Sequence, residues 1–144
     1  MVTRRSFLAI AGVTSAVGIA TIAGIQLLPR EEKPTGDPVI KFGKENCVRC
    51  RMTISDARFA SAWREPNGTE KHFDDVGCMV LQRGETGVSD DSRFWVHDYE
   101  TEEWTDAVTA SYVVSQQILT PMSYGVAALK SPANAETLAH HLGT

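Results

Sequence analysis

The sequence has no basic patch, and its acidic residues outnumber its basic ones. It contains 14 Lys and Arg against 18 Asp and Glu, so the formal net charge is −4. From Glu85 to Asp106 there are eight acidic residues and a single basic one, Arg93. Nucleic-acid binding needs clustered positive charge that neutralises phosphates, so we expect no nucleic-acid partner. We interpret the acidic stretch as a solvated face, with a docking surface for a basic partner as the alternative.

Strong compositional bias is also absent. Hydrophobic residues make up 42% and charged residues 22% of the 144 residues. These values exclude a collagen-like chain, a coiled coil and a wholly disordered protein. The length leaves room for one compact domain and a tail, but not for two sizeable cores.

Charge is missing altogether from residues 7–28, next to the N-terminus. The preceding "TRRSFL" (3–8) is typical of a twin-arginine export signal. The 22-residue apolar run is long enough to span a bilayer as a helix. It also holds a small-residue cleavage motif at 21–23, so cleavage and retention as a membrane anchor both stay open. We predict a signal peptide or anchor over 1–28, a linker over 29–45 and a folded domain over 46–144.

Cysteine is scarce, and all three cysteines lie in the predicted domain. The apolar run does not end in a cysteine, so a lipid anchor there is excluded. Thiols tend to oxidise outside the cytoplasm, and three cannot all pair within one chain. An exported domain of this kind must therefore protect or use the remaining thiol.

Turn and cap residues predict an α+β domain with repeated units. Pro66-Asn67-Gly68 is a strong turn signal and predicts a hairpin over 58–73. Asp74 or Asp75 is placed to cap a helix that ends near Gly84.

The same pattern recurs further along the chain. Residues 93–106 again begin with Arg-Phe and predict a hairpin, and residues 107–117 predict a second helix. The sequence thus predicts two repeated β-hairpin–helix (ββα) units. A strand over 124–129 and a final helix, capped by Ser131 and ending before Gly143, complete the expected elements.

The segment "NCVRCRM" (46–52) contains a C-x-x-C pair, which suits zinc or a redox dithiol. A structural zinc module would need two more ligands, for which Cys78 and His72 are candidates. A thiol-disulfide oxidoreductase would use Cys47 and Cys50, with Arg49 and Arg51 beside them as positive charges that lower a cysteine pKa. Both alternatives stay open, although a thioredoxin-type dithiol normally begins a helix that follows a strand.

Met52 favours a third interpretation. Cu(I) is soft and prefers thiolate and thioether ligands, whereas zinc rarely takes methionine. Cys50 and Met52 point the same way if the stretch is extended, and two or three such donors suffice for Cu(I). Cys78 and Met122 each suit either a ligand or a core position, whereas His97 is expected in solvent.

Three motifs together resemble one known family. "CVRCRMTISDARFASAW", "KHFDDVGCM" and "TPMSYGVAAL" resemble, in that order, the NosL family of accessory proteins encoded with nitrous oxide reductase. The resemblance covers roughly residues 46–140. It implies a fold similar to a domain of organomercurial lyase, with repeated ββα units. Many relatives have glycine where this chain has Arg51, and some have histidine at the position of Val48.

The resemblance also implies a function. Family members are exported Cu(I)-binding proteins, often lipid-anchored, that are regarded as metallochaperones. Carried over, the ligands are Cys50, Met52 and Met122, and Cys47 and Cys78 are further candidates. We therefore expect a non-enzymatic Cu(I) chaperone exported to the periplasm or cell surface, with residues 7–28 as an optional membrane anchor. Its expected acceptor is nitrous oxide reductase or another copper protein.

Overall fold

The computed structural model describes residues 35–144. The predicted export signal, its cleavage motif and the first part of the linker lie outside these residues. Among the described helices, none combines the length and the apolar character that crossing a membrane requires.

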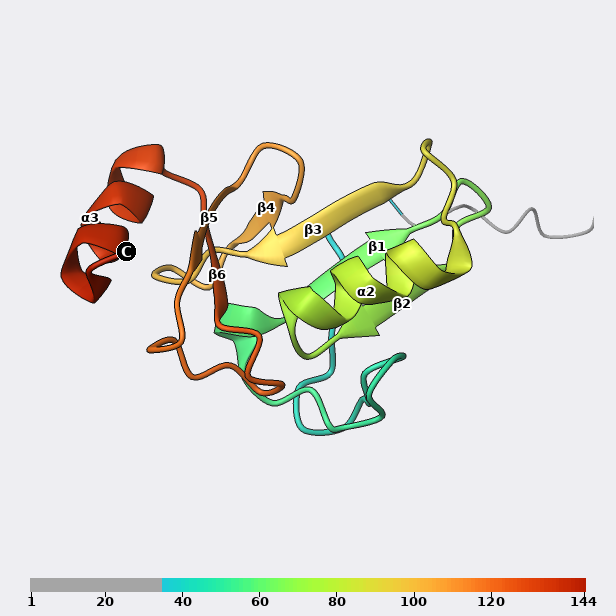
Figure 1. Ribbon diagram of the computed structural model, residues 1–144. Helices are drawn as coiled ribbons and strands as arrows, with labels where there is room; N and C mark the ends of the chain where they lie inside the picture. Colours follow the sequence, from blue (N-terminus) through green and yellow to red (C-terminus); the bar gives the residue numbers. More distant parts are fainter. Residues whose placement is uncertain (1–34) are drawn as a thin grey trace, which may run out of the picture. The chain divides into compact units, whose positions relative to one another are not determined.

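The centre of the domain is a four-stranded antiparallel sheet in the order β2-β1-β3-β4 (Figure 1). Its strands are β1 (Ser61–Arg64), β2 (Glu70–Phe73), β3 (Arg93–His97) and β4 (Trp104–Asp106). β1 lies between β2 and β3, and all four of its residues are buried.

The predicted hairpin between β1 and β2 is confirmed. The N–H of Gly68 donates to the carbonyl of Glu65 at 2.8 Å, and Gly68 has a φ of 93°. This left-handed conformation explains why the turn uses glycine. The strand pairing begins later than predicted, because Ala57–Phe59 form a short 3-10 helix before β1.

Helix α2 (Val76–Thr86) follows β2 and packs on β1 and β2. Asp75 rather than Asp74 caps it, accepting the N–H of Gly77 at 2.9 Å. The helix runs past Gly84 to Gly87, whose φ of 64° and N–H bond to the Arg83 carbonyl provide the cap. An exposed glycine inside a helix costs only about 1 kcal/mol, so Gly84 does not end it.

The helix predicted over 107–117 is wrong. Ser111–Val114 form strand β5, which pairs antiparallel with β6 (Val126–Leu129) in a separate two-stranded sheet. The run Tyr112-Val113-Val114 alternates exposed, buried, exposed, which is the two-residue period of a strand. Its two valines are β-branched and prefer extended backbone.

The predictions for the C-terminal third are otherwise confirmed. β6 falls within the predicted strand, and α3 (Pro132–Leu142) is capped by the Ser131 hydroxyl and ends at Gly143. The predicted hairpin over 93–106 is present as the antiparallel pair β3 and β4. It is followed by strand β5 instead of the predicted helix, so the second predicted ββα unit is not formed as expected.

The acidic stretch is not uniformly solvated. Asp98 is 4% exposed and accepts N–H bonds from Glu100, Thr101 and Lys130. His97 is also buried, which corrects the expectation of a solvated side chain. Its ring stacks on Trp104 with centroids 3.7 Å apart, and its Nδ1 lies 2.8 Å from the Glu102 carbonyl. Part of this acidic segment thus anchors β3 and the turn that follows it.

Candidate metal centre

The C-x-x-C segment forms a tight loop rather than a helix start. An isolated bridge between Asn46 and Thr53 closes its base. Inside it, the N–H of Cys47 donates to the Met52 carbonyl at 2.8 Å, and the N–H of Arg51 donates to the Cys47 carbonyl at 3.1 Å. Arg51 has a φ of 68°, a conformation that favours glycine. The loop therefore has a left-handed residue directly after Cys50.

Three thiols and one carboxylate converge on this loop. The sulfurs of Cys47, Cys50 and Cys78 and a carboxylate oxygen of Asp74 all lie within 4.8 Å of one another. Cys78 comes from the first turn of α2, and Asp74 directly follows β2. Cys47 and Cys78 are completely buried, Asp74 is nearly so, and Cys50 is half-buried. The docking of α2 beside the loop therefore brings together all three cysteines.

The surroundings favour neutral thiols when no cation is bound. Burial raises the pKa of Cys50 to about 11, and the neighbouring Asp74 and Cys47 add to this, while the Met52 N–H opposes it. The Cys50 thiol donates to Asp74 Oδ1 at 3.1 Å. Burial, followed by the proximity of Cys47 and Cys50, likewise raises the pKa of Cys78. A cation bound by these sulfurs would displace their protons.

The two adjacent aspartates have different roles. Asp75 uses both oxygens, one for the Gly77 N–H and the other for the Met122 N–H at 3.1 Å. Asp74 Oδ2 is buried and has no hydrogen-bond partner among the described residues. An unpaired buried carboxylate oxygen is costly, so this aspartate lacks a partner that a bound cation could supply, and its Oδ1 already lies 3.1 Å from the Cys50 sulfur. The donor set therefore fits a bound metal ion.

The structure places the two predicted methionine ligands differently. Met52 follows the left-handed turn, and 51% of it is exposed. Met122 is half-buried and packs against the main core, and its N–H is fixed by Asp75. The thioether part of the predicted site stays a prediction.

A comparison with family models matches residues 39–143 to NosL. The chain belongs to the NosL family. Among solved structures it is similar to the crystal structure of the copper chaperone NosL from Shewanella denitrificans, with a TM-score of 0.63 and 16% sequence identity. That match covers 76% of this chain and 90% of the other, and at this identity it shows the shared fold. No curated protein matches the chain.

The three NosL motifs meet in space around α2. A Cβ atom on Gly77 would lie 2.2 Å from the Tyr124 ring, so only glycine leaves room for this tyrosine. Gly125 has a φ of 67°, and a Cβ there would lie 2.3 Å from the Ser115 carbonyl oxygen. The P-M-x-Y-G segment thus docks on the first turn of the helix that carries Cys78.

Two site hypotheses from the sequence need correction for this NosL domain. His72 does not complete a zinc set, because its Nδ1 lies 2.7 Å from Glu45 and its Nε2 lies 3.4 Å from Glu70. Asp74 instead lies close to the three cysteines. The adjacent pair Asp74-Asp75 before a helix is a usable sequence signal. Only one of two adjacent aspartates can be the helix cap, so the other is free for another role.

The basis for a reactive dithiol is also wrong. Arg49 does not activate Cys50, because it forms a bidentate ion pair with Glu85 at 2.5 and 2.7 Å. The pKa of Cys50 is raised, whereas catalytic thiols need a lowered one.

Proposed function

We propose that this NosL-family protein is a metallochaperone that carries Cu(I) as its cargo. The observation that carries the proposal is the convergence of three thiols beside the carboxylate of Asp74, which is buried and has one oxygen without a hydrogen-bond partner among the described residues. The solved relative is named as a copper chaperone, which supports copper as the metal. Family membership is also consistent with a metal-binding protein that has no catalytic activity.

The proposed cargo site combines Cys50, Met52 and Met122, with Cys47 and Cys78 as further donors. Thiolate and thioether sulfur are soft and polarizable, so they select Cu(I) over harder cations. Cu(I) tolerates low coordination numbers, so the ligands need not all bind at once. Delivery would proceed by ligand exchange, in which donors of the acceptor replace these sulfurs one at a time.

The destination and the route are further parts of the proposal. We propose nitrous oxide reductase as the acceptor, on the basis of the motif resemblance, and another copper protein as the alternative. We propose export by the twin-arginine pathway on the basis of "TRRSFL". The protein would then work in the periplasm or at the cell surface, either released or held by residues 7–28.

One observation favours a second candidate, a zinc site. Zinc accepts cysteine and aspartate ligands in a tetrahedral set, and Asp74 supplies the oxygen that would complete three cysteines. Metal analysis of the anaerobically purified full chain separates the two candidates. Copper supports the chaperone, and zinc alone supports a structural module.

Competition against a Cu(I) chelator tests the ligand set. Cys50→Ser replaces a soft thiolate by a hydroxyl and should lower Cu(I) affinity by orders of magnitude. Met52→Leu and Met122→Leu keep the apolar shape but delete the thioether, so they should weaken binding while the domain stays folded. Met79→Leu is the matched control, because Met79 is 4% exposed in the core, and it should bind Cu(I) like the unmodified chain.

One result would overturn the hypothesis that the Met52 and Met122 thioethers bind Cu(I). If both Met52→Leu and Met122→Leu bind Cu(I) normally while Cys78→Ser abolishes binding, the site is made of three cysteines. A chain that binds zinc more tightly than Cu(I) would refute the chaperone proposal itself.

A further inference from the structure

Strand β5 has one unpaired edge. Ser115 donates its N–H to the Gly125 carbonyl at 2.9 Å, continuing the β5–β6 pairing. In an antiparallel ladder, alternate residues point their backbone groups to the same side. The N–H and C=O groups of Tyr112 and Val114 therefore point away from β6. Among the described strands, only β6 pairs with β5.

This edge lacks the usual protection against pairing. Natural edge strands carry charged residues or proline, or are covered by another element. β5 contains neither proline nor charge, and the whole segment 107–129 is free of charged residues. Val114 is 63% exposed and Tyr112 is 42% exposed.

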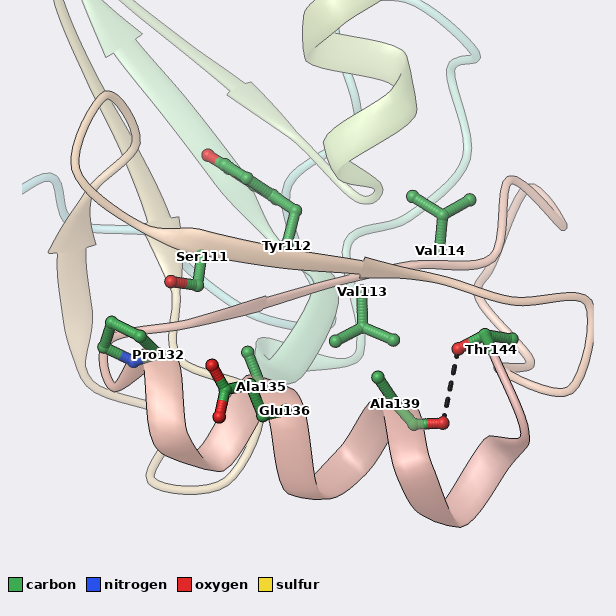
Figure 2. A pocket seen from close by; sticks show the side chains of 9 residues that line it. All are labelled: Ser111, Tyr112, Val113, Val114, Pro132, Ala135, Glu136, Ala139 and Thr144. Carbon is green, nitrogen blue, oxygen red and sulfur yellow. Dashed lines mark hydrogen bonds between the residues drawn. The ribbon is translucent and has the colours of Figure 1, made fainter.

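The two faces of β5 differ in their surroundings. Tyr112 and Val114 project from one face of β5, and Val113 projects toward α3 (Figure 2). An open hollow of about 460 Å³ lies between β5 and α3, where the helix presents the small residues Ala135 and Ala139. Of the residues that line this hollow, Glu136 is the charged one.

The sequence of the edge is nearly symmetric about Val113. It reads Ser-Tyr-Val-Val-Ser from Ser111 to Ser115. We propose that β5 is a self-association edge, along which two copies of this chain pair antiparallel about a two-fold axis through Val113. The result is a four-stranded sheet in the order β6-β5-β5-β6, with the two β5 strands from different copies.

The proposed register satisfies the free backbone groups. Tyr112 of each copy lies opposite Val114 of the other, and the two residues exchange both N–H···O bonds. Their side chains form an aromatic–β-branched pair, which is a favourable cross-strand combination. On the other face Val113 meets its own counterpart, and Ser111 meets Ser115. Such an interface is isologous, so it closes at two copies.

Charge is consistent with a second copy as the occupant. The described residues carry an excess of acid, so two copies repel each other over most surfaces. The uncharged 107–129 segment is a region where like charges do not meet on pairing. The inference is independent of the metal that the protein carries.

Hydrogen exchange and sedimentation of the full chain test the proposal together. The sedimentation coefficient should rise with concentration, and the Tyr112 and Val114 amides should exchange more slowly as it does. Val114→Lys places a charge on the edge and should abolish both changes. Val39→Lys is the matched control, since Val39 is 74% exposed and lies outside β5, and it should behave like the unmodified chain.

The amide measurement needs no variant, so it decides the matter even if Val114→Lys fails to fold. Rapid exchange of both amides at concentrations where the chain self-associates would show that another surface pairs, and would overturn the proposal. A chain that stays monomeric would overturn it as well, and would leave the edge to a strand of another protein. Association that survives in Val114→Lys would have the same meaning.

Discussion

Replacing Gly77 by alanine sets two opposing effects against each other inside α2. Alanine is the better helix former, which should stabilise the chain by about 0.5–1 kcal/mol. The new methyl group, however, would lie 2.2 Å from Cδ2, 2.4 Å from Cγ and 2.8 Å from Cβ of Tyr124. The two nearer the backbone, Cβ and Cγ, cannot be cleared by ring rotation alone. Overpacking of this kind costs about 1–3 kcal/mol, so we expect a net loss of up to about 2.5 kcal/mol.

The same helix contains the matched control. Gly84 has nothing within 4 Å of the position of an added Cβ, so Gly84→Ala should raise the free energy of unfolding by up to about 1 kcal/mol. Urea unfolding, followed through tryptophan fluorescence, to which the fully buried Trp63 contributes, measures both variants. Combining Gly77→Ala with Tyr124→Ala should cancel most of the clash, with an interaction energy of about 1–3 kcal/mol. If Gly77→Ala is as stable as Gly84→Ala, the proposed docking of the tyrosine on the helix is refuted.

Three further predictions concern the turn, the pH dependence and the export signal. Gly68→Val forces a β-branched residue to a φ of 93° and should lower the unfolding free energy by about 1 kcal/mol or more; an unchanged urea midpoint would contradict this. Burial lowers the pKa of His97 below its ordinary 6.5, so the unfolded chain takes up the proton first. Stability should therefore fall as the pH drops below 6.5, and a His97→Gln variant with the same pH slope would refute the assignment. Arg4→Lys combined with Arg5→Lys should abolish export, and undiminished export of this double variant would remove the twin-arginine assignment.

Local chemistry made part of the fold predictable. Each of three features depends only on residues close to it in the chain: the hairpin at Gly68, the cap of α3 at Ser131 and the end of α3 at Gly143. β5 was not predictable in the same way. Its apolar run is short enough to suit a helix or a strand, and its partner β6 lies more than ten residues further along the chain.

The site residues were also predictable only in part. The C-x-x-C spacing identified Cys47 and Cys50 as candidates, and the need for further ligands made Cys78 a candidate as well. The sequence did not indicate Asp74 as a site residue, because a carboxylate in a charged sequence is usually on the surface. Only the packing of α2 against the loop shows that this aspartate is 1% exposed and faces three sulfurs.

The left-handed turn at Arg51 gives the metal centre an inside and an outside. It leaves Met52 in solvent and Cys50 half-buried, while Cys47 and Cys78 are sealed behind them. A metal held by the three cysteines would be within reach of an approaching molecule through Cys50, because Cys47 and Cys78 have no exposed surface. Loading and unloading would then both begin at this half-buried sulfur.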